Sequence, residues 1–434
     1  MNDYSFGKYI FEKRKQFGDS QDELGRKLGV TGKAVSKWEN GSAKPKIQTI
    51  RKMAALWDIS IEELLKAKEN NKKKNVTKIV ITGGPCAGKT TGMSWIQNAF
   101  TERGYTVLFV PETATELISG GVAPWTCSSN SEYQKCQMKL QQEKEKVFEY
   151  AARTMDSEKI LIVCDRGTLD NKAYMTEAEF AIALNYFGAN EVELRDNYDA
   201  VFHLVTAAKG AQKFYTTANN VARTETIEEA AALDDKLIAA WTGHPHLRII
   251  DNSLGFEEKM KHLIAEIANF LGEPEPYEIE RKYLIEYPDI KALENLPNCK
   301  KVEIIQTYLK SSNGTEIRIR QRGSKGSYIY SETHKRTISG LKRVEVERRL
   351  TKDEYLERLM DADSTRKPIR KDRYCLADEN QNFEIDAYPF WSDRAIMEIE
   401  LSNPDEEIRF PDMIRVLREV TEDQQYKNAS LAKI

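Results

Sequence analysis

A short stretch at positions 83–90, GGPCAGKT, combines the residue types that hold a chain of phosphates. It fits the pattern G-x-x-x-x-G-K-[ST], and it stands between the apolar run KIVIT and a helical stretch, which is the context that this pattern requires. Glycines let backbone N–H groups face the phosphates, and the start of a helix adds a favourable dipole. The predicted phosphate-binding residues are Gly83, Gly84, Gly88, Lys89, Thr90 and Thr91. The alternative is a glycine turn that binds no ligand.

Two acids that follow apolar runs could take part in metal binding or catalysis beside this loop. Lys89 is expected to reach the β- and γ-phosphates, and Thr90 to ligate Mg²⁺, with Asp165 at the end of KILIVCD holding the metal or its water. Glu112 follows TVLFV, where it could accept a hydroxyl proton from a second substrate or simply begin a helix. Lys89, Glu112 and Asp165 are therefore the catalytic candidates. Arg166 stands where a mechanical ATPase would carry a second acid, which disfavours a motor ring.

A long polar segment, 207–230, contains several basic residues. It has the composition of a lid that closes on phosphates, with Arg223 as the candidate clamp. A solvated helix pair is the alternative for the same segment.

Charged residues recur at every second position in the last third of the chain. Since alternate residues of a strand share a face, each such segment places its charges on one side of a sheet. The charged pairs are Glu278 with Glu280, Arg318 with Arg320, Glu345 with Glu347, Glu384 with Asp386, and Glu398 with Glu400. Like charges on neighbouring strands repel, so a divalent metal should neutralise the acids, and a polyanion the bases. We expect a closed barrel with a charged lumen and an apolar outside covered by helices; the alternative is a sheet with one solvated face.

The segment 20–41, SQDELGRKLGVTGKAVSKWENG, predicts two short helices joined by a tight turn. Ser20 and Thr31 are suitable N-caps, and Gly29 suits the turn. The expected small core consists of Leu24, Leu28, Val30, Val35 and Trp38. The second helix is left with an exposed, basic N-terminal part, which fits the major groove of DNA.

The spacing of apolar residues divides the chain into three segments that carry these candidate residues. Residues 1–67 show helical spacing only, 77–272 alternate apolar strands with helices, and 276–434 are dominated by period-two strands. The polar segment 68–76 is typical of a linker, and prolines after residue 272 mark a second boundary. The predicted fold is therefore multidomain: an all-α helix-turn-helix bundle, an α/β parallel sheet carrying the phosphate loop, and an antiparallel β tunnel.

The composition argues against a membrane protein and against a secreted protein stabilised by disulfides. Of the 434 residues, 40% are hydrophobic and 31% are charged, and no apolar run is long enough to span a bilayer. The six cysteines are scattered, and charge appears early in the first residues, so we expect a cytoplasmic protein with reduced thiols. Residues 1–75 hold 17 Lys/Arg against 10 Asp/Glu within a chain of net charge −3, so a basic head precedes an acidic body. The head is therefore expected to meet a large anion.

Each segment also resembles a known family. Residues 5–66 resemble the Cro/repressor (XRE-type) helix-turn-helix family, which implies DNA contacts by Gln21, Lys33, Ser36 and Lys37. The stretch 77–272 resembles the AAA_28-type P-loop family, relatives of nicotinamide riboside kinase domains, through GGPCAGKT, VPETATEL, DRGTLD and NNVARTE. That resemblance implies binding of ATP or GTP with Mg²⁺.

The last segment, about 276–430, resembles the CYTH or triphosphate tunnel metalloenzyme family, whose signature E-x-E-x-K is Glu278, Glu280 and Lys282. The resemblance implies Mg²⁺ or Mn²⁺ ligands at Glu278, Glu280, Glu347, Glu398 and Glu400. It implies phosphate contacts at Lys282, Arg318, Arg320, Lys335, Arg366 and Arg373. Members differ in reaction, so the fold alone does not fix the chemistry.

Two hypotheses follow for the whole chain. In the first, a kinase-like nucleotide-binding domain is joined to a metal-dependent triphosphate hydrolase under a DNA-binding regulatory head. In the second, the protein is a transcriptional regulator that binds nucleotide and phosphorylated ligands without turnover. The expected partners are double-stranded DNA, a nucleotide and a triphosphate-bearing small molecule. Heads of this type often act as dimers, so a homodimer is also expected.

Overall fold

The computed structural model describes residues 4–39, 43–57, 59, 75–215, 226–253, 255–273, 279–311, 316–339, 342–401 and 406–433. The chain divides into two compact units, Met1–Asn75 with Asp156–Lys159, and Val76–Met155 with Ile160–Ile434. Within the described ranges, no helix has the length and apolar character needed to cross a membrane.

The head is a small helical bundle. Its helices are α1 (Tyr4–Gln16), α2 (Gln21–Leu28), α3 (Gly32–Glu39) and α4 (Ile47–Trp57). Ser20 caps α2 by accepting from the backbone N–H of Glu23 at 3.2 Å, and Gly29 makes the turn with φ +76°. The predicted core is confirmed: Leu24, Leu28, Val35 and Trp38 are buried, and Val30 packs against them.

The next part, residues 75–272, is called the five-stranded domain. Its strands are β1 (Asn75–Thr82), β2 (Thr106–Val110), β3 (Lys159–Asp165), β4 (Ala200–Leu204) and β5 (Leu247–Ile250). They lie in the order β2-β3-β1-β4-β5, and the registers of β1 with β4, β2 with β3 and β4 with β5 are parallel. All five strands coincide with apolar runs in the sequence.

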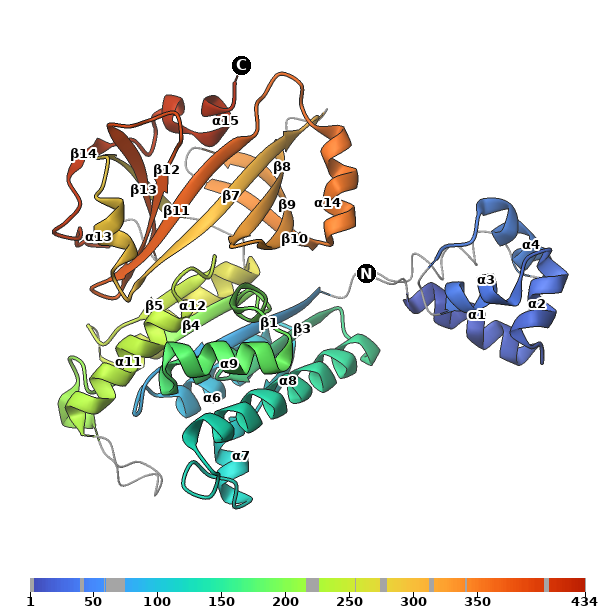
Figure 1. Ribbon diagram of the computed structural model, residues 1–434, viewed down its shortest axis with the longest axis horizontal. Helices are drawn as coiled ribbons and strands as arrows, with labels where there is room; N and C mark the ends of the chain where they lie inside the picture. The colour runs from blue at the N-terminus through green and yellow to red at the C-terminus, as the bar shows by residue number, and fades with distance from the viewer. Residues whose placement is uncertain are drawn as a thin grey trace. The chain divides into compact units, whose positions relative to one another are not determined.

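Helices cover both faces of this sheet (Figure 1). One face packs against α6 (Lys89–Glu102) and α12 (Phe256–Leu271). The other packs against α8 (Asn130–Thr154), α9 (Glu177–Phe187) and α11 (Ile227–Trp241). The smaller helices are α7 (Thr113–Ser119), η1 (Thr168–Tyr174), α10 (Glu191–Arg195) and η2 (Gln212–Phe214). Because strand residues alternate between these two apolar layers, the sheet is buried on both sides, as a parallel sheet requires.

Residues 279–433 form the nine-stranded domain. Its strands are β6 (Ile279–Glu286), β7 (Cys299–Leu309), β8 (Glu316–Ser324), β9 (Ser327–Ser339), β10 (Lys342–Leu350), β11 (Ile369–Asp378), β12 (Gln381–Ala387), β13 (Arg394–Leu401) and β14 (Val416–Glu419). They lie in the order β10-β9-β8-β7-β11-β12-β13-β6-β14, with antiparallel neighbours throughout. The fold class predicted from the sequence is therefore confirmed in all three parts.

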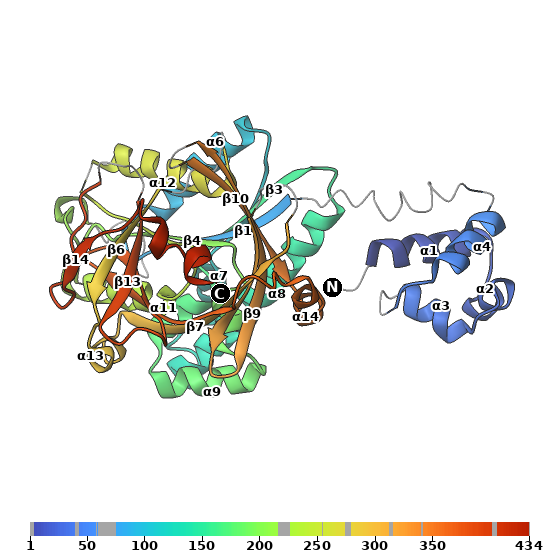
Figure 2. The same ribbon diagram turned by 90° about the horizontal axis from the view of Figure 1, so that it is seen from above.

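One detail of that prediction is wrong: the sheet is open rather than a closed barrel. Its edge strands are β10 and β14, and no ladder joins them among the described residues, although the sheet is strongly curved (Figures 1 and 2). With antiparallel neighbours in an odd-numbered series, the two edge strands run in the same direction. Antiparallel closure is thus impossible, and β14 is only 4 residues long.

The two faces of the open sheet differ as the sequence predicts. One face is apolar and packs against α13 (Ile290–Glu294) and α14 (Lys352–Arg358), with η3 (Leu359–Asp361) following α14. The other, called the charged face, carries Glu280, Lys282, Arg318, Arg320, Arg322, Lys335, Glu347, Lys371, Arg373, Glu384, Asp386, Glu398 and Glu400. Near one end of this face, the C-terminal η4 (Gln424–Tyr426) and α15 (Asn428–Leu431) complete a small apolar cluster.

Buried ion pairs join the five-stranded and nine-stranded domains. The guanidinium of Arg322 on β8 lies 3.0 Å from Asp196, which also pairs with Arg195 at 2.7 Å. Arg322 donates a further hydrogen bond to the carbonyl of Gly243. Since removing one member of such a network would leave a buried charge, these contacts fix how the two domains meet.

Candidate functional site

The loop after β1 has its lysine folded inward. Lys89 is buried, and its Nζ donates to the carbonyls of Gly83 at 3.1 Å and Gly84 at 3.4 Å. Burial and the nearby Arg166 lower the pKa of Lys89 to about 8, against the opposing effect of Asp165. The loop thus presents a desolvated cation, held by backbone carbonyls, which a phosphate oxygen can replace.

Glycine is required in this loop by close backbone approaches. A Cβ on Gly83 would stand 2.1 Å from the carbonyl oxygen of Leu204, and Gly83 has φ +142°. At Gly88, with φ +91°, a Cβ would meet the ring of Phe256 at 2.8 Å. Thr90 and Thr91 follow on the exposed first turn of α6, so both hydroxyls are accessible to a ligand.

Sequence reasoning missed Asp234, the residue that anchors this loop. Its buried carboxylate Oδ1 accepts from the backbone N–H groups of Gly84 at 2.9 Å and Thr206 at 3.2 Å, and lies 3.0 Å from Nε2 of His203. These partners and the Lys209 ammonium outweigh burial and hold the pKa of Asp234 well below its usual range. No local pattern could reveal it, because Asp234 lies on α11, far along the chain from the loop.

Lys209 belongs to the basic segment that was predicted to close on phosphates. It instead pairs with Asp234 at 3.1 Å and with Asp235 at 2.5 Å. The predicted clamp, Arg223, lies outside the described residues.

Asp165 at the end of β3 has an unsatisfied oxygen. Its Oδ1 is buried and has no hydrogen-bond partner within the described part of the chain, and burial raises its pKa despite the nearby Lys89. A hard cation bound by this carboxylate together with the Thr90 hydroxyl would satisfy that oxygen. The residues present therefore fit Mg²⁺ at this site.

Glu112, the predicted proton acceptor, is already engaged. Arg166 adopts the unusual φ +68° and points its Nε to Glu112 Oε1 at 2.8 Å. Burial favours the neutral acid, but Arg166 and Lys89 outweigh it and hold the pKa of Glu112 at about 2. In this state the carboxylate is a weak base, so Glu112 is better placed to orient Arg166 than to accept a proton.

On the nine-stranded domain, the predicted metal ligands come together with their own counter-ions. Glu280 and Glu400 face each other in the β6–β13 register, as do Lys282 and Glu398. Lys282 Nζ lies 3.1 Å from Glu280 and also contacts Glu398, and Arg373 lies 2.7 Å from Glu398. These cations outweigh burial and hold the pKa of Glu398 well below its usual range.

Further ion pairs extend this cluster across β11 and β12. Arg373 Nε lies 2.7 Å from Asp386, and Arg373 also contacts Glu384, while Lys371 contacts Asp386. Among the described residues, no three His, Cys, Asp or Glu side chains form a ready metal-binding group. Each carboxylate turns to a Lys or Arg instead, and Glu278 lies outside the described residues. The set fits a divalent metal in its oxygen donors and in-register acids, but a metal would have to displace these cations.

The predicted phosphate-binding bases lie mainly on the other side of the charged face. Arg318 and Arg320 project from β8 opposite Thr333 and Ser331 of β9, and Lys335 stands opposite Glu316. Arg366 is half-buried over the Tyr308 ring at 4.8 Å from its centroid. The remaining predicted acid, Glu347, accepts from Thr333 at 2.9 Å on edge strand β10. It therefore lies at one edge of the sheet, whereas Glu280 is on β6, next to the other edge strand.

Three of the predicted DNA-contact residues, Gln21, Lys33 and Ser36, line one hollow of the head. Lys33 and Lys37 are on α3, and Ser36 lies between them in the sequence of the helix. The amide of Gln21 donates to Glu39 at 2.7 Å, and Arg14 holds the same carboxylate at 2.5 Å. Gln21 is thereby oriented at the start of α2, beside the helix that carries the lysines.

Comparison with known proteins gives matches to separate parts of the chain. A family model described as helix-turn-helix matches residues 10–64, and one described as AAA domain matches residues 78–259. No curated protein matches the chain.

Among solved structures, the inorganic triphosphatase NE1496 is 27% identical, over 36% of this chain and 93% of that chain, with TM-score 0.26. The P22 c2 repressor in complex with a synthetic operator is 29% identical, over 14% of this chain and 94% of that chain, with TM-score 0.14. The PH1012 protein from Pyrococcus horikoshii OT3 is 21% identical, over 29% and 80%, with TM-score 0.23. By the family models, residues 10–64 are similar to helix-turn-helix domains and residues 78–259 to AAA domains.

Proposed function

We propose that the charged face of the nine-stranded domain binds and hydrolyses a triphosphate with Mg²⁺ or Mn²⁺. In the same chain, the five-stranded domain binds ATP or GTP, and the head binds DNA. The observation that carries the proposal is the division of this face. Acids concentrate on β12, β13 and β6, whereas Arg318, Arg320 and Lys335 lie on β8 and β9. A polyphosphate and its metal ion need both kinds of charge at once.

In this proposal, Arg318, Arg320, Lys335 and Arg366 bind phosphate oxygens. Glu280, Glu398 and Glu400, with Glu278, hold the metal, and Lys282 and Arg373 must exchange carboxylates for phosphates as the ligand enters. The metal would supply Lewis-acid polarisation of the terminal phosphoryl group and of the attacking water. The existing ion pairs hold the acids within reach of one another before the ligand arrives.

For the five-stranded domain, we propose binding of ATP or GTP by the loop 83–90 with Mg²⁺ at Thr90 and Asp165. Lys89 exchanges the carbonyls of Gly83 and Gly84 for phosphate oxygens. The unsatisfied Oδ1 of Asp165 supports the metal assignment. Glu112 remains the candidate contact to a second substrate, although its pairing with Arg166 favours a positioning role.

The second candidate function is a regulator that binds these ligands without turnover. It is favoured by the ion pairs that already neutralise Glu398 and Glu112. In either case, Gln21, Lys33, Ser36 and Lys37 are the proposed DNA contacts, and a homodimer would supply two such heads.

The test is a screen for phosphate release by the full-length chain, over nucleotides, tripolyphosphate and thiamine triphosphate, with Mg²⁺ and with Mn²⁺. Lys89→Ala is assayed in parallel, so that hydrolysis at the loop 83–90 is subtracted. Release that survives Lys89→Ala and disappears with Glu398→Gln supports the hydrolase. Ligand binding without release from any substrate favours the regulator.

A further inference from the structure

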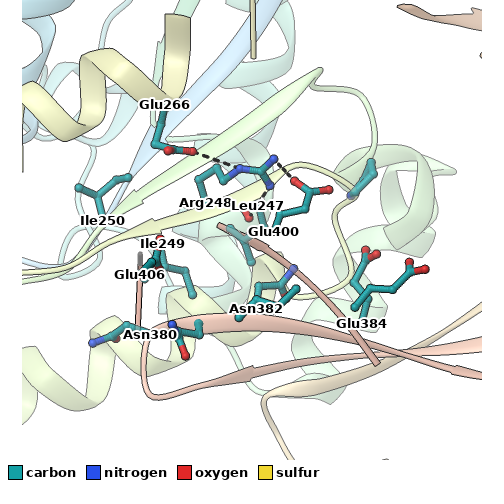
Figure 3. Close-up of a pocket in the computed structure, with 14 residues that line it drawn as sticks. Leu247, Arg248, Ile249, Ile250, Glu266, Asn380, Asn382, Glu384, Glu400 and Glu406 are labelled. Atoms are coloured by element: carbon teal, nitrogen blue, oxygen red, sulfur yellow. Dashed lines mark hydrogen bonds and ion pairs between the residues drawn. The ribbon is translucent and has the colours of Figure 1, made fainter. Parts of the chain in front are cut away.

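An arginine of the five-stranded domain reaches into the charged face of the nine-stranded domain. Arg248 lies on β5, and its guanidinium donates to Glu400 on β13 (Figure 3). The same guanidinium lies 3.3 Å from Glu266 on α12, which belongs to its own domain. Arg248 therefore stands between two carboxylates, one on each side of the domain junction.

Glu400, the acid that Arg248 neutralises, differs from the other acids of the charged face in its position. Glu400 faces Glu280 directly in the β6–β13 register, so two like charges lie side by side on neighbouring strands. Lys282 contacts Glu280 and Glu398, and Arg373 contacts Glu398. Arg248 is thus a cation that the neighbouring domain supplies to the acid pair, at its Glu400 member.

The position of Arg248 is fixed by the end of its strand. Asn252, shortly after β5, donates to the carbonyls of Thr206 and Lys209, both at 2.7 Å. Lys259 on α12 in turn donates to Asn252 at 2.7 Å and to the carbonyl of Val205 at 2.6 Å. With its strand end anchored in this way, Arg248 can change partners by side-chain rotation, without movement of β5.

A cleft lies at this junction. It is lined by Arg248 and Glu266 from one domain, and by Asn382, Glu384, Glu398 and Glu400 from the other (Figure 3). Because Glu384, Glu398 and Glu400 line the cleft, a small cation that enters it meets these carboxylates. Since Glu266 is adjacent, Arg248 retains an anionic partner after it gives up Glu400, which lowers the cost of the exchange.

We propose that Arg248 is a positioning residue that competes with the divalent metal for Glu400: it pairs with this carboxylate in the metal-free chain and moves to Glu266 when the metal binds. The inference rests on the proposed function, in which Glu400 is a metal ligand. It makes the metal site a property of both domains rather than of the nine-stranded sheet alone.

The test is the affinity for Mn²⁺ alone, without nucleotide, of the full-length chain carrying Asp165→Asn, which removes the other proposed metal ligand. It is measured by calorimetry and by the decrease of the free Mn²⁺ signal in electron paramagnetic resonance. Arg248→Gln should bind Mn²⁺ roughly fivefold tighter or more, the lower range of coupling between linked sites. Glu266→Gln should shift the affinity in the opposite direction, because it removes the carboxylate to which Arg248 would move. Arg248→Lys, which keeps the charge but not the planar fork, should lie between wild type and Arg248→Gln.

Opposite shifts in Arg248→Gln and Glu266→Gln cannot come from general damage to the fold, which would weaken both. Unchanged or weaker Mn²⁺ binding in Arg248→Gln overturns the competition. Glu400→Gln distinguishes a wrong role for Arg248 from a wrong assignment of the metal site. If it abolishes Mn²⁺ binding while Arg248→Gln resembles wild type, only the role of Arg248 is wrong; if it binds like wild type, Glu400 is not a ligand and the proposed metal site falls as well.

Discussion

The two proposed phosphate-binding regions hold their cations in opposite ways. In the loop 83–90, Lys89 is bound by carbonyls of its own loop, and glycines allow the close approaches. On the charged face, Lys282 and Arg373 are bound by carboxylates from different strands, and Arg248 extends from another domain. The first site is assembled by local backbone geometry, and the second by sheet register and domain contact. A ligand enters the first by replacing neutral carbonyls, but must break ion pairs to enter the second.

The largest expected effect concerns Asp234, a long-range element of the loop site. Asp234→Ala should lower the free energy of unfolding by about 3–5 kcal/mol, because Gly84, Thr206, His203 and Lys209 share this buried partner. Urea unfolding of the full-length chain measures it. The matched control is Asp235→Ala: this neighbour also pairs with Lys209 but is 70% exposed, so its removal should cost less than about 1 kcal/mol. Equal destabilisation in both variants would mean that Asp234 does not anchor the loop.

The next effect separates the two regions directly. Lys89→Ala should weaken ATP or GTP binding about a hundredfold or more, since it removes charge-assisted hydrogen bonds to two phosphates. Phosphate release and Mn²⁺ binding at the charged face should remain. Calorimetric titration measures the nucleotide affinity of this variant, and Lys139→Ala, which replaces an exposed lysine on α8, is the control. Nucleotide affinity equal to that of wild type would refute the loop assignment, and absence of both functions would refute the separation of the sites.

The contrast also explains what sequence alone could predict. The loop motif, its strand and helix, and the helix-turn-helix core follow from residues near one another in the chain, and these elements form as expected. Alternation of charge likewise predicts the strands of the charged face. Asp234, Arg166 at φ +68° and Arg248 were missed, because their roles depend on partners brought close only by tertiary structure. The expectation of a closed barrel was wrong for a similar reason, because closure depends on the number and direction of all the strands, which no single strand encodes.

The smallest effect concerns the head, another site assembled locally. Lys33→Ala with Lys37→Ala should weaken binding to a selected operator by about 1–3 kcal/mol for each base edge that a lysine binds. The paired control, Lys33→Arg with Lys37→Arg, keeps both charges and should retain most of the non-specific affinity. Fluorescence anisotropy at fixed salt measures both. Unchanged operator affinity in the alanine variant would show that α3 is not the helix that enters the groove.

The most direct test of the charged face is the melting temperature of the full-length chain with Mn²⁺ and tripolyphosphate. All samples carry Lys89→Ala, so that the loop 83–90 does not contribute. A ligand that binds only the native state stabilises it by mass action, so Mn²⁺ with tripolyphosphate should raise the melting temperature. Adding Glu278→Gln with Glu280→Gln preserves side-chain volume but removes the charge that a hard cation needs, and should abolish the rise. An equal rise with and without these two substitutions, or no rise at all, would contradict a metal-dependent triphosphate site on this face.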